Sequence, residues 1–345
     1  MFLILICILL LELIILQSTA EPGYPKRLPR VVVFNGNDAY HTSIEGFIAN
    51  ASTWGYEVIS VDYLNNASLT NAEILVLNAP DFLTEDDKNI VETWWGLGGK
   101  SIWFVGESDY AGQWNPADLN ELAVDLGSDI IIVDDAISDT ASPDGASYRV
   151  IANTTNSDPT WDNVLRQWSP EITNITMHGP TYVAPWTGDN TGNVTSNPGA
   201  QVTWASLPNA DWIVNSSKYA TVKDQDFDND DVWEGASPLS TGSFAMVAAQ
   251  WGLAGGNKMI FSGESIFSDY KNMFGYETYY TGLSIQNINL TRGLLEWAFD
   301  PATELDIDIA DDTKNPIVTV FSGNGAYHTA IEGFKANATT WGYTV

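Results

Sequence analysis

The end of this chain repeats its beginning, and the repeat limits what the chain can fold into. Residues 318–345 match residues 31–58 without a gap at an offset of 287, and 21 of the 28 positions are identical. A period of this size is far longer than the unit of a solenoid, so the repeating unit must be a whole domain. The sequence therefore predicts one complete domain over 31–300 and the truncated start of a second copy over 317–345. We expect the natural gene product to continue.

Composition indicates a folded and strongly acidic protein. Hydrophobic residues make up 44% of the chain, which is enough for a sizeable core and argues against disorder. The 44 acidic and 14 basic residues give a formal net charge of −30. Such a surface repels nucleic acid and anionic membranes, so no nucleic-acid partner is expected. It is typical of a solvated acidic surface, with the binding of cations such as calcium as the alternative.

The first 20 residues are typical of a secretory signal peptide. Residues 1–16 are apolar except for Glu12, and Ser18 and Ala20 supply small side chains before a cleavage site. The apolar stretch is short for a membrane span, which needs about 20 residues. We expect cleavage after Ala20, a linker over 21–30, and an extracellular or cell-surface protein. A retained leader that anchors the chain in a membrane is the alternative.

The sequons and the cysteine content fit an exported glycoprotein. The only cysteine, Cys7, lies in the leader, so the mature chain has no disulfide and no cysteine nucleophile. N-x-S/T sequons mark surface positions that carry glycans in secreted proteins. The eight candidate glycosylation sites are Asn50, Asn66, Asn153, Asn174, Asn193, Asn215, Asn289 and Asn337.

Strands alternate with helices through the first part of the domain. Short apolar runs bounded by turn residues predict strands at 31–35, 58–61, 74–77, 101–105 and 130–133. Helices are expected to begin at Thr42, at Thr84 and at Asn115, where Pro116 would take the first helical position. Such alternation is typical of βαβ units, so we predict an α/β fold with a parallel sheet covered on both faces.

The first two helices show detailed signals. Thr42 and Glu45 have the spacing of a capping box, and Ile48 becomes Lys335 in the second copy, which predicts a solvent-facing position. Helical spacing predicts one core-facing stripe of Ile44, Phe47, Ala51 and Trp54. It predicts a second stripe of Ile90, Val91, Trp94 and Leu97, ended by Gly98 and Gly99.

The pattern changes at about residue 135. Residues 135–240 are rich in Asn, Thr, Pro, Gly and Trp and contain short β-like pieces at 148–151 and 201–206, so we predict a β-rich insertion. Regular structure resumes with strands at 244–250 and 258–261 and a helix over about 285–299. Residues 301–316 are acidic and flanked by proline, which is typical of a linker.

Ligand-binding residues are expected at the carboxyl ends of the strands, where open α/β sheets bind their ligands. Three segments converge there: 36–42, 106–110 and 263–270. A histidine, two glutamates and two serines at one edge could form an acid–base or Ser-His-Glu site. The alternative is that the Gly-Glu-Ser turns only redirect the chain, and no residue is assigned a catalytic role. The candidate ligand-binding residues are Asn37, Tyr40, His41, Glu107, Ser108, Glu264, Ser265 and Asp269.

One acidic run has the spacing of a calcium loop. Alternating aspartates resemble the ligand positions of an EF-hand, although Asn229 stands where glycine is expected and the glutamate comes one residue early. A calcium site is one interpretation and a solvated acidic loop is the other. The candidate metal ligands are Asp224, Asp226, Asp228, Asp230 and Glu234.

Several motifs resemble the class I glutamine amidotransferase-like superfamily, in its ThuA-like and secreted archaeal-type branches. They are VVVFNGNDAYHTSIEGF, WWGLGGKSIWFVGESDY, MIFSGESIFSD and LLEWAFD, within 31–134 and 240–300. The resemblance implies a flavodoxin-like three-layer α/β/α fold. Catalytic members carry a cysteine after the strand that corresponds to 101–105, where this chain has Glu107 and Ser108. Amidotransferase activity is therefore excluded, and His41 matches a histidine of ThuA-like members.

Two functions are compatible with these features. The first is a secreted, glycosylated, non-catalytic structural or assembly protein of a surface layer, filament or stalk, built from tandem amidotransferase-like domains. Its partners would be further copies of itself, which the 317–345 fragment could join by domain swapping, or other surface proteins. The alternative is a carbohydrate-directed hydrolase or glycan-binding protein that uses His41, Glu107 and Glu264 at the carboxyl edge of the sheet.

Overall fold

The computed structural model describes residues 28–108, 114–141, 143–157, 161, 174–185, 204–223 and 240–299. The chain divides into two compact units, 1–300 and 301–345, and the described residues belong to the first. Several predictions fall outside the described residues. These are the signal peptide, most of the 21–30 linker, the acidic loop 224–234, the 301–316 linker, the second copy over 317–345, and the sequons Asn193 and Asn337.

Five parallel strands form the predicted core of the sheet. Their order is β2-β1-β3-β4-β15, and every neighbouring pair is parallel. This is the strand order of flavodoxin-like folds. β4 is buried along its whole length, as its continuous apolar sequence predicts for a strand covered on both faces. The strands are β1 (Arg30–Phe34), β2 (Glu57–Val61), β3 (Ala72–Asn78), β4 (Ser101–Val105) and β15 (Lys258–Ser262).

The sheet continues beyond β15 with antiparallel strands, which the predicted parallel sheet did not include. β14 pairs antiparallel with β15, and β10 pairs antiparallel with both β14 and β5. The strand predicted at 130–133 is therefore not the fifth parallel strand, whose place is taken by β15. These added strands are β5 (Ile130–Ile132), β8 (Thr154–Thr155), β10 (Val183–Pro185), β11 (Ala210–Asn215) and β14 (Ala245–Gln250).

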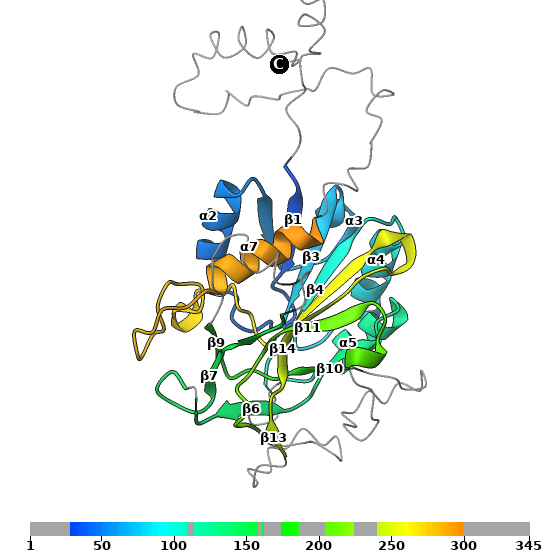
Figure 1. Cartoon of the computed structure of the whole chain (residues 1–345). Coiled ribbons are helices and arrows are strands. Elements are labelled where there is room, and N and C mark those ends of the chain that lie inside the picture. The colour runs from blue at the N-terminus through cyan, green and yellow to red at the C-terminus, as the bar shows by residue number, and fades with distance from the viewer. Residues whose placement is uncertain are drawn as a thin grey trace, which may run out of the picture. The chain divides into compact units, whose positions relative to one another are not determined.

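The β-rich character predicted for 135–240 is confirmed in its described residues, but the segment is not a separate lobe. β8, β10 and β11 belong to the central sheet. The other strands form a three-stranded sheet, β13-β12-β6, and a two-stranded sheet, β7-β9 (Figure 1). Residues 204–206 form a 3₁₀ helix instead of the predicted strand. The bounds are β6 (Ala136–Asp139), β7 (Arg149–Ala152), β9 (Ile175–His178), β12 (Ala220–Lys223) and β13 (Ser240–Gly242).

Helices cover both faces of the sheet. α2 and α7 lie together on one side, where the Arg292 guanidinium stands 5.6 Å from the ring of Trp54, and α4 and α5 lie on the other side (Figure 1). None of the helices in the described part of the chain is long and apolar enough to cross a membrane. The helices are α2 (Glu45–Thr53), α3 (Asn66–Leu69), α4 (Glu85–Trp95), α5 (Ala117–Asp125) and α7 (Asn287–Ala298).

The start of α2 differs from the predicted capping box. The helix begins at Glu45, its N-cap residue is Ile44, and no side chain of that residue caps it. The backbone N–H of Gly46 instead donates to Asp269 Oδ2 at 2.8 Å. A carboxylate 223 residues away thus takes the position that favours an anion at a helix N-terminus. Sequence spacing has no means of revealing such a cap.

The helical stripes are largely as predicted. Ile44, Phe47 and Ala51 are buried, and Ile48 packs partly against the core instead of facing solvent. In α4, Val91 and Trp94 are buried, as predicted. Leu97 is 72% exposed because α4 ends at Trp95, so the prediction that it lies in the stripe was wrong.

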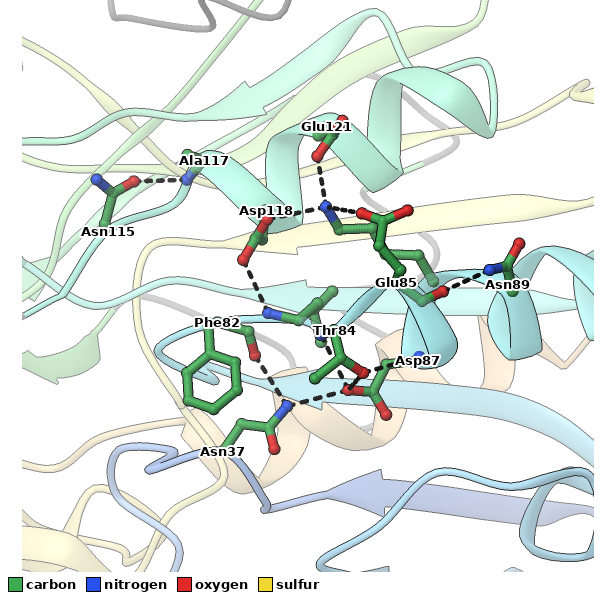
Figure 2. A network of polar contacts seen from close by, with 12 residues as sticks. Asn37, Phe82, Thr84, Glu85, Asp87, Asn89, Asn115, Ala117, Asp118 and Glu121 are labelled. Carbon is green, nitrogen blue, oxygen red and sulfur yellow. Dashed lines mark hydrogen bonds and ion pairs between the residues drawn. The ribbon is translucent and has the colours of Figure 1, made fainter.

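Lys88 joins α4 to α5 on the side of the sheet away from α7. Its ammonium donates to Asp118 at 2.8 Å and to Glu121, and both carboxylates lie on α5 (Figure 2). Burial lowers the pKa of Lys88, but the hydrogen bonds to Asp118 and Glu121 outweigh it and hold the pKa above its ordinary value. Thr84 caps α4 by accepting from the backbone N–H of Asp87, as the predicted start at Thr84 requires.

Candidate functional site

Three strands bring the predicted site residues together at one edge of the sheet. His41 follows β1, Glu107 follows β4 and Glu264 follows β15, and the carboxyl ends of these parallel strands meet at that edge. His41 Nδ1 lies 2.7 Å from Glu264 Oε1 and 3.2 Å from Glu107 Oε2. The three side chains form what we call the acid–base cluster. Their exposed fractions are 14% for His41, 8% for Glu107 and 1% for Glu264.

A glycine precedes each glutamate because the backbone there touches the segment before β10. A Cβ on Gly263 would lie 2.1 Å from the carbonyl oxygen of Thr181, and a Cβ on Gly106 would lie 2.9 Å from the Thr181 methyl group. Real Cβ atoms do not approach so closely, so only glycine fits at either position. The two Gly-Glu-Ser motifs thus hold both carboxyl groups close to the same segment.

Glu264 accepts more hydrogen bonds from protein groups than Glu107 does. Its Oε1 accepts from His41 Nδ1 at 2.7 Å and from the backbone N–H of Ser265 at 2.8 Å. Glu107 Oε1 accepts from the backbone N–H of Ser108 at 3.1 Å. The other oxygen of Glu264 is buried and has no hydrogen-bond partner among the described residues, and the other oxygen of Glu107 has only the longer 3.2 Å contact with His41 Nδ1. A proton shared between the two carboxyl groups would satisfy both oxygens.

Burial sets the charge of the cluster. It raises the pKa of Glu107 well above its ordinary value, and the nearby charge of Glu264 raises it further. Burial also raises the pKa of Glu264, against the hydrogen bonds from Ser265 and Glu107, which lower it. Burial lowers the pKa of His41, although the charge of Glu107 acts in the opposite direction. We interpret the cluster as protonated Glu107, ionised Glu264 and neutral His41, titrating as one coupled group.

His41 is held in a backbone conformation that side chains rarely adopt. Its φ is 50°, and those of Asn37 and Asp38 in the same loop are both 55°. Left-handed conformations of residues other than glycine persist only where the surrounding structure enforces them, and they concentrate at functional sites. Here the hydrogen bond to Glu264 and the ring of Tyr270, stacked on the imidazole at 4.2 Å, fix the side chain.

The remaining predicted ligand-binding residues have different surroundings. Asn37 donates to Phe82 O at 3.0 Å and to Asp87 Oδ2 at 3.1 Å, which fastens its loop to the start of α4 (Figure 2). Asp269 caps α2, and Tyr40 is partly buried. Burial raises the pKa of Tyr40, and the charges of Asp81 and Glu107 raise it further.

The two serines lie directly beside the glutamates. Ser108 Oγ is 3.5 Å from Glu107 Oε1, and the hydroxyl of Ser265 is buried with no partner among the described residues. Neither has a short hydrogen bond to His41 among those described. The geometry therefore gives no support to a Ser-His-Glu triad, and the acid–base interpretation stands on His41 and the two glutamates.

Aromatic and histidine residues that the sequence did not single out surround His41. The ring of His178, at the end of β9, is 6.3 Å from His41 and 5.0 Å from Tyr270, and Tyr148 is 5.5 Å from His178. Tyr279 and Tyr280 contact each other at 4.7 Å nearby. We call Tyr148, Tyr270, Tyr279 and Tyr280 the tyrosine rim. Their exposed fractions run from 37% to 56%.

The acid–base cluster also contains three residues of types that bind metal ions. One ligand atom each from His41, Glu107 and Glu264 lie within 4.8 Å of one another, a spacing that would admit a divalent cation. The direct 2.7 Å hydrogen bond between His41 and Glu264 satisfies both groups without one. The calcium ligands expected from sequence, Asp224–Glu234, lie outside the described residues.

A separate concavity lies away from the cluster. It measures about 570 Å³ and is lined by Trp204, Trp212 and Trp251 beside Asp211 and Asn156. Trp251 follows the end of β14, which pairs with the beginning of β15, so this pocket is at the opposite edge of the sheet from Glu264. It contains one ionisable side chain among the residues that line it, whereas the acid–base cluster contains three.

The six described sequons differ in exposure. Asn66 and Asn153 are exposed, whereas Asn50, Asn174, Asn215 and Asn289 are partly buried. The side-chain nitrogens of Asn50 and Asn174 donate to the backbone carbonyls of Gly46 and Ser284. Of these positions, Asn66 and Asn153 are the most exposed and in that respect the best placed to accept a glycan.

Comparisons with known proteins bear on the fold. No protein-family model matches the chain, and no curated protein matches it. The chain is similar to the mmIFT52 N-terminal domain, with 10% sequence identity and a TM-score of 0.51, over 80% of this chain and 100% of that one. It is also similar to a putative ThuA-like protein from Bacteroides uniformis ATCC 8492, with 12% identity and a TM-score of 0.40, over 80% and 95% of the two chains.

These similarities support a fold and not an activity. The TM-score of 0.40 to the ThuA-like protein is too low to carry an argument. At 10% identity, the similarity to the mmIFT52 domain concerns the fold alone. The chain is an α/β protein with a flavodoxin-like parallel sheet, extended by antiparallel strands, and shares that fold with the mmIFT52 N-terminal domain.

Proposed function

We propose that this chain is an extracellular, carbohydrate-directed hydrolase whose reaction is carried out at the acid–base cluster. The observation that carries the proposal is the short contact between His41 and the buried Glu264. A carboxylate that accepts from Nδ1–H of a histidine fixes the tautomer and leaves Nε2 free as a base. A strained residue and shifted pKa values at one sheet edge are typical of functional sites.

The steps follow from the positions of the protons. Neutral His41 accepts a proton from a water molecule through Nε2, and the water oxygen attacks the saccharide substrate as the bond to the leaving oxygen breaks. Ionised Glu264 stabilises the imidazolium, which then returns its proton to solvent, while a second water molecule protonates the leaving oxygen on the opposite face of the sugar ring. Glu264 is a positioning residue here. Protonated Glu107 keeps the buried pair at one negative charge, so the imidazolium balances it.

The tyrosine rim supports a saccharide as the substrate. Exposed tyrosine rings offer flat apolar faces for the C–H faces of sugar rings and hydroxyls for hydrogen bonding. Tyr270 stacks on His41, so a sugar that packs on the rim would lie next to the base. The distances within the cluster are shorter than the carboxylate separations of glycosidases, about 5 Å or more, so we assign the base to His41 and not to a glutamate.

We also propose that the chain is exported and that it belongs to the superfamily its motifs resemble. The leader, the sequons and the absence of cysteine from the mature chain support an extracellular protein, and exposed Asn66 and Asn153 suit glycosylation. The motifs and the β2-β1-β3-β4-β15 order support a member of the class I glutamine amidotransferase-like superfamily that has lost the cysteine nucleophile.

Binding of saccharides tests the proposal. Isothermal titration with a panel of neutral and acidic oligosaccharides is expected to find at least one that binds, and His41→Ala is expected to weaken that binding at least tenfold. Glu92→Gln, on the exposed face of α4, serves as the matched control and should bind as the wild type does. Saccharide binding that His41→Ala leaves intact would place the ligand elsewhere and refute the site.

A second candidate function is assembly through tandem copies, and the internal repeat favours it. The second copy retains Ile331, Phe334 and Ala338 at the positions of buried Ile44, Phe47 and Ala51, and it retains His328 at the position of His41. A fragment with these residues could pack on another chain in place of that chain's own segment. Sedimentation of the full chain should then show concentration-dependent oligomers that Phe334→Asp removes. A monomer at all concentrations would rule this function out.

A further inference from the structure

Two cations stand in the tyrosine rim of a protein with a large excess of acidic residues. Arg149, at the start of β7, is 9% exposed, and its guanidinium carbon lies 3.7 Å from the ring centre of Tyr280 and 4.9 Å from that of Tyr148. The ammonium of Lys271 lies 5.1 Å from the ring centre of Tyr279 and 5.7 Å from that of Tyr270. The rim therefore carries two positive charges close to His41.

Neither cation forms an ion pair with a carboxylate in the described part of the chain. Arg149 Nε donates to the backbone carbonyl of Asp144 at 2.6 Å, and Nη1 donates to the hydroxyl of Tyr148 at 2.9 Å. The Asp144 carboxylate accepts instead from the backbone N–H groups of Tyr280 and Thr281, at 3.1 Å and 2.9 Å, and so fixes the loop that carries the rim. A buried guanidinium is ordinarily paired with an anion, and no carboxylate among the described residues takes that place beside Arg149.

The second cation, Lys271, lies in a turn with strained backbone angles. Lys271 and Asn272 have φ values of 46° and 59°, in the left-handed region that favours glycine. The Asn272 side chain donates to Glu277 O at 2.5 Å, which closes the turn. A turn of such residues persists only when the surrounding contacts enforce it, and here it presents Lys271 beside three tyrosine rings.

Both cations lie close enough to His178 for their charges to act on its imidazole. Burial lowers its pKa to about 4, and the charges of His41, Arg149 and Lys271 add to the shift. The positive field at the rim thus faces the same space as His41. A neutral sugar would gain little from this field, whereas a carboxylate or sulfate group would gain a charge-assisted hydrogen bond from a preorganised guanidinium.

We propose that the tyrosine rim selects an acidic saccharide, with Arg149 and Lys271 binding its carboxylate or sulfate group while the sugar ring packs on the tyrosines. This inference rests on the proposed function and names its substrate class. Arg149 supplies a planar donor already oriented by Asp144 and Tyr148, so little conformational entropy is lost on binding. Binding should weaken with salt, because the charges at the rim are partly exposed and the protein as a whole is acidic.

Paired oligosaccharides that differ only in charge test the inference. Hexasaccharides of galacturonate, alginate and heparin are each compared with their carboxyl-reduced or desulfated forms by isothermal titration against the full chain. At least one acidic member is expected to bind tenfold more tightly than its neutral partner. Arg149→Gln and Lys271→Gln should each remove most of that difference. Lys258→Gln is the matched control, since Lys258 stacks on Trp297 at the opposite end of β15.

The outcomes separate this inference from the proposed function. Neutral forms that bind as well as the acidic ones, and lose affinity with His41→Ala, would uphold the saccharide site and overturn acidic selection. An acidic preference that Arg149→Gln and Lys271→Gln leave unchanged would also overturn it, provided that their thermal unfolding matches the wild type. Failure of every saccharide to bind would overturn both.

Discussion

Glu264→Gln is expected to lower the turnover of the bound saccharide by about 10²–10⁴-fold, with a much smaller change in KM. An ionised carboxylate holds the proton of His41 on Nδ1 and stabilises the imidazolium that forms during the reaction. A glutamine side chain carries no charge, and its amide can donate to Nδ1 and thereby place the proton on Nε2, where the base must be free. The ground-state contacts with the sugar remain, so kcat should carry most of the loss.

Glu107→Gln is expected to lower turnover much less than Glu264→Gln does. We infer that Glu107 is already protonated, and a glutamine has nearly the same shape and can donate the same hydrogen bond to Glu264. Its turnover should therefore fall by no more than about tenfold, which is far less than the loss for Glu264→Gln. Steady-state kinetics on both variants and on the Glu92→Gln control measure the difference. Equal losses for the two glutamates would show that they act only as a structural pair.

The pH dependence of turnover should also reflect the need for a neutral His41. The base must be neutral, and burial lowers the pKa of His41 below its ordinary value of about 6.5. The acid limb of kcat/KM in the wild type should therefore lie below pH 6.5. Loss of the Glu264 charge removes a group that stabilises the imidazolium, so the acid limb of any residual activity in Glu264→Gln should move further toward acid.

Stability should fall as the pH rises above about 4.5, and Glu107→Gln should remove part of that fall. Burial raises the pKa of both Glu107 and Glu264 in the folded state, so the folded protein binds protons more strongly than the unfolded chain does. Stabilisation from a raised pKa is complete below the unfolded value, about 4.3 for glutamate, and is lost as the pH rises toward the folded value. Each proton contributes a slope of about 1.4 kcal/mol per pH unit within that window.

Urea unfolding at several pH values checks this expectation. The wild type should lose stability between pH 5 and pH 8 relative to Glu107→Gln, and the variant should be the more stable protein at pH 8. Glu92→Gln changes the net charge by the same amount at an exposed position, so it corrects for the general repulsion of an acidic protein. Parallel pH curves for the wild type and Glu107→Gln would show that the pair does not retain a proton.

Local pattern was sufficient to predict the parallel part of the fold. The apolar runs at 31–35 and 101–105 became β1 and β4, and Thr84 caps α4 as its sequence context indicated. The convergence of His41, Glu107 and Glu264 could also be predicted, because each follows a parallel strand and such ends share one edge. Their contact distances and shared proton depend on side-chain packing and could not be inferred from spacing.

Long-range pairing produced the features that sequence reasoning missed. β10 and β11 join the central sheet from within the segment interpreted as an insertion, and short strands carry no signal of the partner they will pair with. The cap of α2 by Asp269 bridges 223 residues, so the capping box of Thr42 and Glu45 was a local pattern without the expected structure. Arg149 and Tyr280 meet only in the fold. Besides their place after parallel strands, the Gly-Glu-Ser echo was a second signal that marked both glutamates.

Histidine resonances offer the most direct measurement of the central claim, which is that a saccharide binds at a neutral, carboxylate-oriented His41. The chain has three histidines, so ¹⁵N spectra of histidine-labelled protein can be assigned with His41→Ala and His178→Ala. We predict that His41 is neutral at pH 7 with its proton on Nδ1, and that its Nε2 signal moves when a binding saccharide is added. A charged His41 at pH 7, or a saccharide that binds without moving its signals, would contradict the account.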